Sequence, residues 1–317
     1  MSTSPDRRLA RLAPTVATAL LTAVTLSGCV IGTVDDGDAD GDAGQTVVTV
    51  TDDGAPDPTG PATSTSTTPA AGSAGSAGSA EGAEVNTDIP YALAYLDNGS
   101  VVTAGDLETT VAWSTSKVPV AVAALRAVED GTSLSDAATV QGNVTSAITA
   151  SDNGAAQALW DSLGDPATAG AKVEDVLREG GDASTTVQTQ VVRDGFTSFG
   201  QTLWSTADQV RFAGELSCLA GAQPVLTAMG QISAGQDYGL GRIPEARYKG
   251  GWGPDTSGSY QVRQFGLVPG ADGTLVPVAV AVTSPDGSYE SGSAVLSGIV
   301  DQLSGTLSGV HGVETTC

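Results

Sequence analysis

Histidine is almost absent from this chain of 317 residues, since His311 is the only one. A nucleophilic serine would therefore need a base other than imidazole. Once one of the three cysteines is assigned to the lipid anchor described below, one histidine and two cysteines cannot form a zinc site. Positive charge is also scarce: 13 Lys+Arg oppose 36 Asp+Glu, and the net charge of −23 excludes nucleic acid as a partner. Only three basic residues are lysines, whose amines can lose a proton at working pH as a guanidinium cannot. We expect no metal and no other cofactor.

Cysteine is nearly as rare, and the first one, Cys29, follows a segment typical of an export signal. Three arginines precede residues 12–26, a mostly small and apolar run that is too short to span a bilayer comfortably. The segment ends in Leu26-Ser27-Gly28-Cys29, which resembles a bacterial lipobox. We therefore expect residues 1–28 to be a lipoprotein signal peptide and Cys29 to carry a lipid that anchors the exported chain to the outer face of a bacterial cell membrane. The alternative is an ordinary signal peptide cut nearby, with Cys29 as a free thiol.

Large apolar side chains are missing from residues 29–85, which consist mainly of Gly, Ala, Ser, Thr, Pro and Asp. Such a composition cannot bury enough surface to offset the entropy of the chain, so we expect a flexible tether. Residues 86–317 remain, which suits one domain with its own core, and we expect a monomer. Cys218 and Cys317 lie in this domain, and in an oxidising compartment they are expected to form a disulfide. Two free buried thiols are the alternative.

Strand patterns lie at both ends of this domain, and helix patterns lie between them. A hairpin is expected at residues 91–104, and three later strands at residues 246–252, 262–268 and 276–283. Helical spacing occurs at residues 116–129, 144–150, 155–163, 167–179, 207–219 and 292–307. The order predicts an α/β domain of the α+β type. One antiparallel sheet is formed from the N- and C-terminal strands and flanked by helices, with the middle helices as a helical subdomain.

Two of the three lysines stand in short motifs with serine and glycine. Ser114-Thr115-Ser116-Lys117 opens the first long helix, so Ser114 and Lys117 lie on one face, near backbone N–H groups that favour a developing oxyanion. Lys117, if neutral, can take the Ser114 proton, and a neighbouring cation such as Lys249 favours that neutral form. Taken alone, Ser-x-x-Lys is a weak signal in a serine-rich chain.

Two further motifs add polar groups. Ser151-Asp152-Asn153 follows Ser114 by 37 residues, and its hydroxyl and carboxamide can relay a proton and bind a substrate amide, although the string is also a good helix N-cap. Lys249-Gly250-Gly251-Trp252 ends a strand, where glycines permit close approach of a substrate and the ammonium attracts a carboxylate, although the glycines also suit a turn.

The three motifs in this order resemble the penicillin-recognising serine hydrolases, the class A β-lactamases and low-molecular-mass penicillin-binding proteins. The resemblance spans nearly the whole domain and implies their β-lactamase/transpeptidase-like fold. It implies that Ser114 is the nucleophile, Lys117 its base and Ser151 a proton relay. Asn153 and Lys249 would bind substrate, and backbone N–H groups of Ser114 and Trp252, with Gly251 beside them, would form an oxyanion hole.

Three departures from that family bear on activity. Residues 182–190 have no counterpart of the glutamate that activates water in class A enzymes, and Glu174 and Glu179 fall in a helix upstream, where a solvated face is the simpler interpretation. Gly250 replaces a residue with a hydroxyl that helps to hold the substrate carboxylate; Arg263 or Arg247 would have to compensate, although a surface charge is the simpler role for each. The segment between the first two motifs is also short for class A.

These features favour an exported acyltransferase or hydrolase of the penicillin-binding type that acts on D-Ala-D-Ala-like cell-wall peptides. One alternative is a class A-like β-lactamase whose ligand is a β-lactam. The other is an inactive cell-wall-binding lipoprotein on the same fold, which the loss of the hydroxyl at Gly250 favours and the intact motifs oppose.

Overall fold

The computed structural model describes residues 85–107, 109–255 and 257–314. The expected signal peptide, Cys29, nearly all of the tether and Cys317 lie outside the described residues. Within the described part of the chain, none of the helices combines the length and apolar character that a membrane crossing requires.

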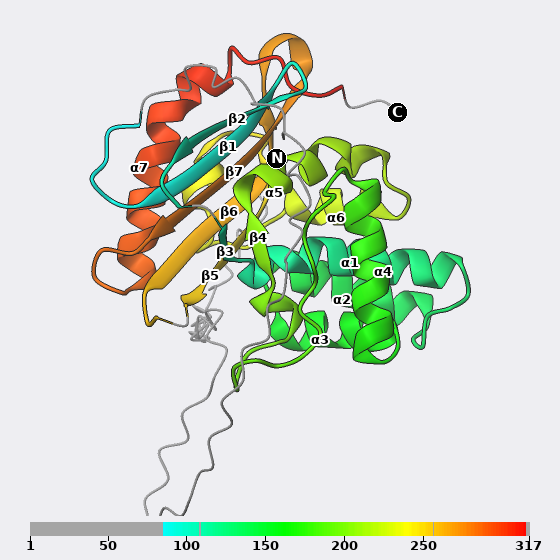
Figure 1. Ribbon diagram of the computed structural model, residues 1–317. Coiled ribbons are helices and arrows are strands. Elements are labelled where there is room, and N and C mark those ends of the chain that lie inside the picture. The colour runs from blue at the N-terminus through cyan, green and yellow to red at the C-terminus, as the bar shows by residue number, and fades with distance from the viewer. Residues whose placement is uncertain (1–84, 108, 256, 315–317) are drawn as a thin grey trace, which may run out of the picture.

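A five-stranded antiparallel sheet forms one side of the molecule (Figure 1), in the order β2-β1-β7-β6-β5. The strands are β1 (Tyr91–Asp97), β2 (Ser100–Gly105), β5 (Arg247–Pro254), β6 (Tyr260–Pro269) and β7 (Leu275–Thr283). The central strand β7 is buried on both faces along Val276–Val282, as its run of Val and Ala requires. The sheet therefore joins the first two strands of the domain to the last three, and the predicted fold class is confirmed.

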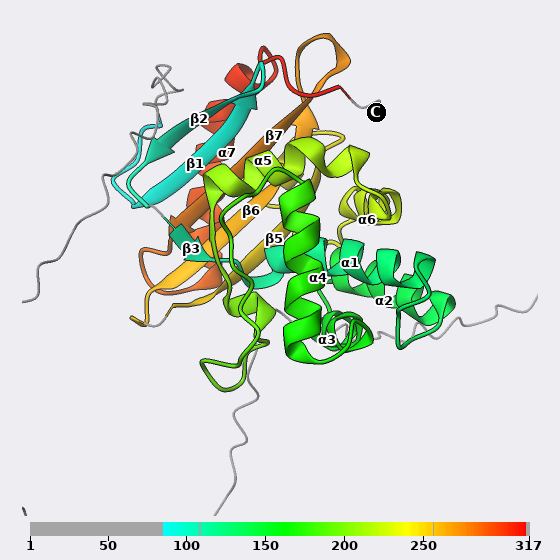
Figure 2. The ribbon, with the colours of Figure 1, turned by 45° about the vertical axis from the view of Figure 1, so that its right-hand side comes forward.

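Helices cover both faces of the sheet. Helix α7 (Tyr289–Leu307) lies along one face, where Leu296, Ile299 and Leu303 pack on β6 and β7. Helix α5 (Thr206–Glu215) crosses the other face against β1 and β7, and the helical subdomain lies beyond it (Figure 2). The result is a layered domain with one apolar core on each side of the sheet.

The helical subdomain surrounds α1, whose residues are buried almost without interruption from Lys117 to Ala124. Its helices are α1 (Lys117–Glu129), α2 (Ala137–Thr149), α3 (Asn153–Ser162), α4 (Pro166–Glu179) and α6 (Ala222–Met229). Aspartates cap α2, α3 and α4: Asp136, Asp152 and Asp165 each accept hydrogen bonds from backbone N–H groups of the first turn. A small sheet of β3 (Thr109–Val111) and β4 (Leu203–Ser205) connects the subdomain to the main sheet.

Several element boundaries differ from the prediction. Helix α2 begins at Ala137 rather than at residue 144, because the Asp136 cap starts it about two turns earlier. The helix expected at residues 207–219 ends at Glu215 and continues as the short 3-10 helix η3 (Leu216–Cys218). Helix α6 was not predicted, since it is only 8 residues long and contains a proline, and β3 and β4 are 3 residues each, too short for a recognisable alternation.

Candidate active site

The Ser114 turn is strained and tightly bonded. It begins directly after β3, as the 3-10 helix η1 (Trp113–Ser116), and runs into α1 at Lys117. Trp113 has φ of 49°, a left-handed conformation that costs a residue with a side chain about 1–3 kcal/mol. Within the turn, the Thr115 hydroxyl donates to Ala112 O at 2.5 Å and the Ser116 hydroxyl donates to Trp113 O at 2.7 Å. These bonds hold Ser114 and Lys117, each with 2% of its surface exposed, at the junction of strand and helix.

Ser151 lies in the loop between α2 and α3 and is the second strained residue, with φ of 59°. The adjacent Asp152 caps α3, since its Oδ1 accepts from the Ala155 N–H at 2.8 Å. Asp152 is exposed and so does not point inward. The N-cap interpretation and the functional interpretation of this motif are therefore compatible: the aspartate caps the helix while its neighbours turn toward Lys117.

Lys117, Ser151, Asn153 and Lys249 form one hydrogen-bonded group, called the two-lysine cluster below. Lys117 Nζ donates to Ser151 O at 2.5 Å, to Ser151 Oγ at 3.3 Å and to Asn153 Oδ1 at 2.8 Å. Lys249 Nζ donates to the same Ser151 Oγ at 2.9 Å and to Gly250 O at 3.0 Å. Two amines from distant parts of the chain thus meet at one hydroxyl, and burial of both disfavours charging both at once.

Strand β5, which contains Lys249, packs closely against the Ser114 turn. A Cβ built on Gly251 would lie 2.8 Å from the Ser114 backbone nitrogen and 3.0 Å from Ala112 O, so only glycine fits there. β5 is the edge strand of the main sheet, and its next residue, Trp252, is buried with its ring 4.7 Å from that of Tyr289. Gly251 is therefore beside the N–H of Ser114, and Trp252 follows it on β5, where the predicted oxyanion hole would lie.

Tyr238 is a site residue that the sequence analysis missed. A Cβ built on Gly250 would lie 2.9 Å from the Tyr238 hydroxyl, so the phenol occupies the space that a side chain at residue 250 would need. The Tyr238 ring contacts Tyr289 edge-on at 5.6 Å. No spacing in the sequence relates an aromatic residue eleven positions before the lysine motif to that strand, so only the fold could reveal it.

Arg263 has a different role from the two that the sequence suggested. It is 0% exposed, so it is not a surface charge, and it lies opposite Gly251 in the β5–β6 pair with its side chain in the core. Its Nη1 donates to Thr110 O at 3.0 Å, Thr110 Oγ1 at 2.7 Å and Val111 O at 3.0 Å, and its Nη2 donates to Trp204 O at 3.0 Å and to Gln209 Oε1. Burial lowers the pKa of Arg263 to about 9, so it stays charged at neutral pH. Arg247 is exposed at the start of β5.

The Arg263 contacts extend to the Ser114 turn. Gln209 of α5 accepts from Arg263 and donates from Nε2 to Thr115 Oγ1 at 3.1 Å. Thr115 lies between Ser114 and Lys117 and bonds back to Ala112 O. Arg263 thus holds the strand that enters the turn and, through Gln209, the turn itself.

The acidic residues of α4 and the following loop are engaged with backbone groups. Glu174 Oε1 accepts from the Val187 N–H at 2.8 Å, so it is not on a purely solvated face as expected. Asp182 is 0% exposed and accepts from Ser184 N, Thr185 N and Trp204 Nε1. Glu179 is exposed and pairs with Arg126 at 2.7 Å.

Two further expectations concern metal binding and the disulfide. Within the described ranges, no three His, Cys, Asp or Glu residues are grouped as a metal site would need. Cys218 lies in η3, and because Cys317 is outside the described residues their pairing stays a prediction.

Comparison with known proteins identifies the fold. No protein-family model and no curated protein matches the chain. A class A β-lactamase from Bacteroides cellulosilyticus superposes with a TM-score of 0.57 at 17% identity, over 70% of this chain and 93% of the other. β-Lactamases from Chitinophaga pinensis (TM-score 0.57, 16% identity, 69% and 94% covered) and Burkholderia vietnamiensis (0.55, 18%, 70% and 93%) are similar as well. The chain therefore has the fold of the penicillin-recognising serine hydrolases.

Proposed function

We propose that this chain is an exported, lipid-anchored serine acyltransferase or hydrolase of the penicillin-binding type. Its substrate would be a D-Ala-D-Ala-like cell-wall peptide, and its nucleophile Ser114. The observation that carries the proposal is the pair of buried amines, Lys117 and Lys249, that hydrogen-bond the same Ser151 hydroxyl beside the Ser114 turn. Export and the lipid on Cys29 rest on the sequence alone.

The chemistry proposed for this site is acyl transfer in balanced steps. Neutral Lys117 removes the Ser114 proton as the oxygen attacks the substrate carbonyl, and the oxyanion that forms accepts hydrogen bonds from the N–H groups of Ser114 and Trp252. The proton then passes from Lys117 through the Ser151 hydroxyl to the leaving nitrogen as the carbon–nitrogen bond breaks. An ester on Ser114 remains, and water or an amine releases it. Lys249 holds the substrate carboxylate and favours neutral Lys117.

The acidic residues of α4 and the following loop favour slow release of the acyl group from Ser114. Asp182 lies in residues 182–190 and Glu174 bonds to Val187 of the same segment, and both carboxylates accept from backbone N–H groups. The carboxylate oxygens that would have to accept a proton from water are thus already bonded to the backbone. Ester hydrolysis would then lack an efficient general base, as in a penicillin-binding protein.

A β-lactamase is the second candidate, because the solved structures with this fold that are described above are β-lactamases. An inactive binding module is the third, favoured by the missing hydroxyl at Gly250. The Tyr238 hydroxyl, which occupies the same space, weakens that argument.

A fluorescent penicillin separates the three candidates on one gel. The penicillin-binding form gives a covalent label that persists for many minutes, whereas a β-lactamase gives a label that disappears while the antibiotic is destroyed. The binding module gives no label under conditions that label a known penicillin-binding protein. Lys117→Arg should not label, although it keeps the charge, because arginine does not act as a base; labelling of that variant at the wild-type rate would contradict the role of Lys117.

Ser116→Ala provides the matched control for Ser114→Ala. Ser116 lies two residues along in the same turn, is also buried, and donates only to Trp113 O. We expect Ser114→Ala to abolish the label and Ser116→Ala to retain it. Label retained by folded Ser114→Ala would place the reactive group elsewhere, and loss of label in both variants, with both still folded by circular dichroism, would contradict the specific role of Ser114.

A further inference from the structure

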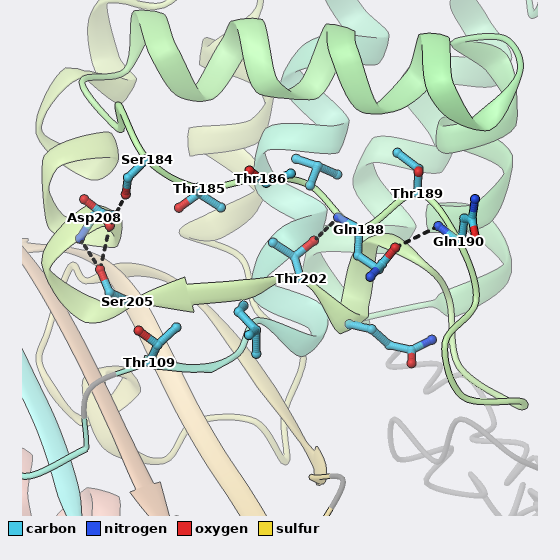
Figure 3. Close-up of a pocket in the computed structure, with 13 residues that line it drawn as sticks. Thr109, Ser184, Thr185, Thr186, Gln188, Thr189, Gln190, Thr202, Ser205 and Asp208 are labelled. Atoms are coloured by element: carbon cyan, nitrogen blue, oxygen red, sulfur yellow. Dashed lines mark hydrogen bonds between the residues drawn. The ribbon is translucent and has the colours of Figure 1, made fainter. Parts of the chain in front are cut away.

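A pocket of about 630 Å³ lies away from the two-lysine cluster, between residues 184–190, strand β4 and the start of β3 (Figure 3). Ten of its thirteen lining residues are Thr, Ser or Gln, and none belongs to the two-lysine cluster. Its volume lies within the usual range for small-molecule sites. A surface so rich in neutral hydroxyl and carboxamide groups suits a ligand that offers many hydrogen-bonding groups of its own.

Hydrogen bonds from α4 and from Thr202 hold the wall formed by residues 184–190 in place. Arg178 donates to Thr185 O at 2.6 Å, Glu174 accepts from Val187 N at 2.8 Å, and Thr202 Oγ1 accepts from Gln188 N at 3.0 Å. Thr202 O also accepts from Ala112 N at 2.7 Å, so the same residue supports the strand that leads to Ser114. The pocket is therefore formed before any ligand arrives, which lowers the entropic cost of binding.

Several polar side chains in this wall have hydrogen-bonding capacity to offer. Among the described residues, the side chains of Thr186, Thr189 and Gln190 make no hydrogen bond, and Thr186 and Gln190 are exposed. At the other end of the pocket, Asp208 is already engaged by Ser184 and Ser205, as Figure 3 shows.

The lining excludes most other ligand classes. It contains no Lys, Arg or His, and its one charged residue is Asp208, so an anion has no partner. It contains no aromatic ring on which a base could stack. A peptide strand would need a row of free backbone N–H groups, but five of the seven in residues 184–190 are bonded within the chain, which disfavours a peptide.

We propose that this pocket binds an uncharged saccharide through the side chains of Thr186 and Gln190. The proposal does not depend on catalysis at Ser114. The ligand binds by hydrogen bonds without aromatic stacking, so its dissociation constant is of the order of 1 mM.

Saturation-transfer NMR on the full chain tests this site, with N-acetylglucosamine trimer and maltotriose as neutral sugars and tri-alanine amide as a neutral peptide. Calorimetry then gives the dissociation constant. We expect transfer to at least one of the two sugars and none to the peptide. Thr186→Val/Gln190→Leu should weaken sugar binding by at least about tenfold, because two exposed contacts are lost.

Gln141→Leu/Thr145→Val is the control, because it makes the same changes at exposed positions of α2 and should leave sugar binding unchanged. Ser114→Ala should also bind sugar as the wild type does, so that failure of the proposed catalysis and failure of this site remain distinguishable. The proposal is overturned if neither sugar shows transfer at 10 mM, a concentration about tenfold above the expected constant. It is also overturned if the peptide binds in place of the sugars, or if the folded pocket variant binds sugar as tightly as the control.

Discussion

Arg263→Lys is the substitution that best tests how the Ser114 turn is held. The guanidinium of Arg263 donates from one nitrogen to Thr110 and Val111 and from the other to Trp204 and Gln209. A lysine keeps the charge, but its single nitrogen on a differently shaped stem cannot serve both sides of this fork. Buried carbonyl groups on one side therefore lose their partner.

The expected loss follows from those carbonyl groups. If two buried acceptors are left without a donor, at about 1–3 kcal/mol each, the free energy of unfolding falls by roughly 2–6 kcal/mol. In a domain of this size, each kcal/mol lowers the melting temperature by about 2–4 °C, so a fall of about 4–24 °C is expected. Acylation should slow as well, because misplacement of a nucleophile by about 1 Å costs of the order of a hundredfold in rate.

Arg242→Lys provides the matched control. Arg242 pairs with Asp301 at 2.9 Å, and both side chains are half exposed, so this change should alter stability by less than about 1 kcal/mol. Thermal melting measures the stability of both variants. The rate of penicillin labelling, taken well below both melting temperatures, reports whether Ser114 is still correctly positioned in its turn. If Arg263→Lys melts and labels as Arg242→Lys does, Arg263 does not hold the Ser114 turn.

Two other predictions follow from hydroxyl and carboxylate positions. Tyr238→Phe should slow acylation by a carboxylate-bearing penicillin about tenfold, because the hydrogen bond from the phenol to the penicillin carboxylate is lost. Tyr238→Phe/Gly250→Ser should recover part of that rate. An unchanged labelling rate in the single variant would show that the phenol does not contact substrate. The side-chain hydrogen bond from Thr168, with backbone bonds, lowers the pKa of Asp165 below 3.8, so its contribution to stability is present above about pH 4 and is lost as the pH falls through the folded-state value. The difference in melting temperature between wild type and Asp165→Ala should therefore shrink from pH 6 to pH 2.5, and an equal difference at both pH values would contradict the cap as the cause.

The sheet and α1 could be predicted from the sequence because local patterns decide them. Period-two alternation and a continuous apolar run predict the strands β1, β6 and β7. Helical spacing that ends at Asp130-Gly131 predicts α1, and each predicted end of this helix lies within one residue of the observed end. These signals need no knowledge of the tertiary fold. The family resemblance then gave the layout of the three motifs.

Arg263 and Tyr238 could not be placed in this way, since their roles depend on register and loop path. Arg263 is buried because β6 turns that side chain toward Thr110 and Gln209, residues 153 and 54 positions away. Tyr238 reaches Gly250 because a loop before β5 folds back on the strand. A charge or an aromatic residue in a single sequence carries no signal for either arrangement.

The charge distribution of the molecule supports catalysis over an inert binding role. The chain has a net charge of −23, yet Lys117, Lys249 and Arg263 are all buried around the strand and turn that carry Ser114. All three donate to neutral oxygens of the backbone, hydroxyls or carboxamides. Burying a cation such as Arg263 or Lys249 costs several kcal/mol before its hydrogen bonds are counted, a buried neutral amine such as Lys117 also loses its contacts with water, and apolar residues of similar size would often be more stable. A module that only bound cell-wall material would not need this arrangement, whereas a site that stabilises an oxyanion and moves a proton between two amines and a hydroxyl does.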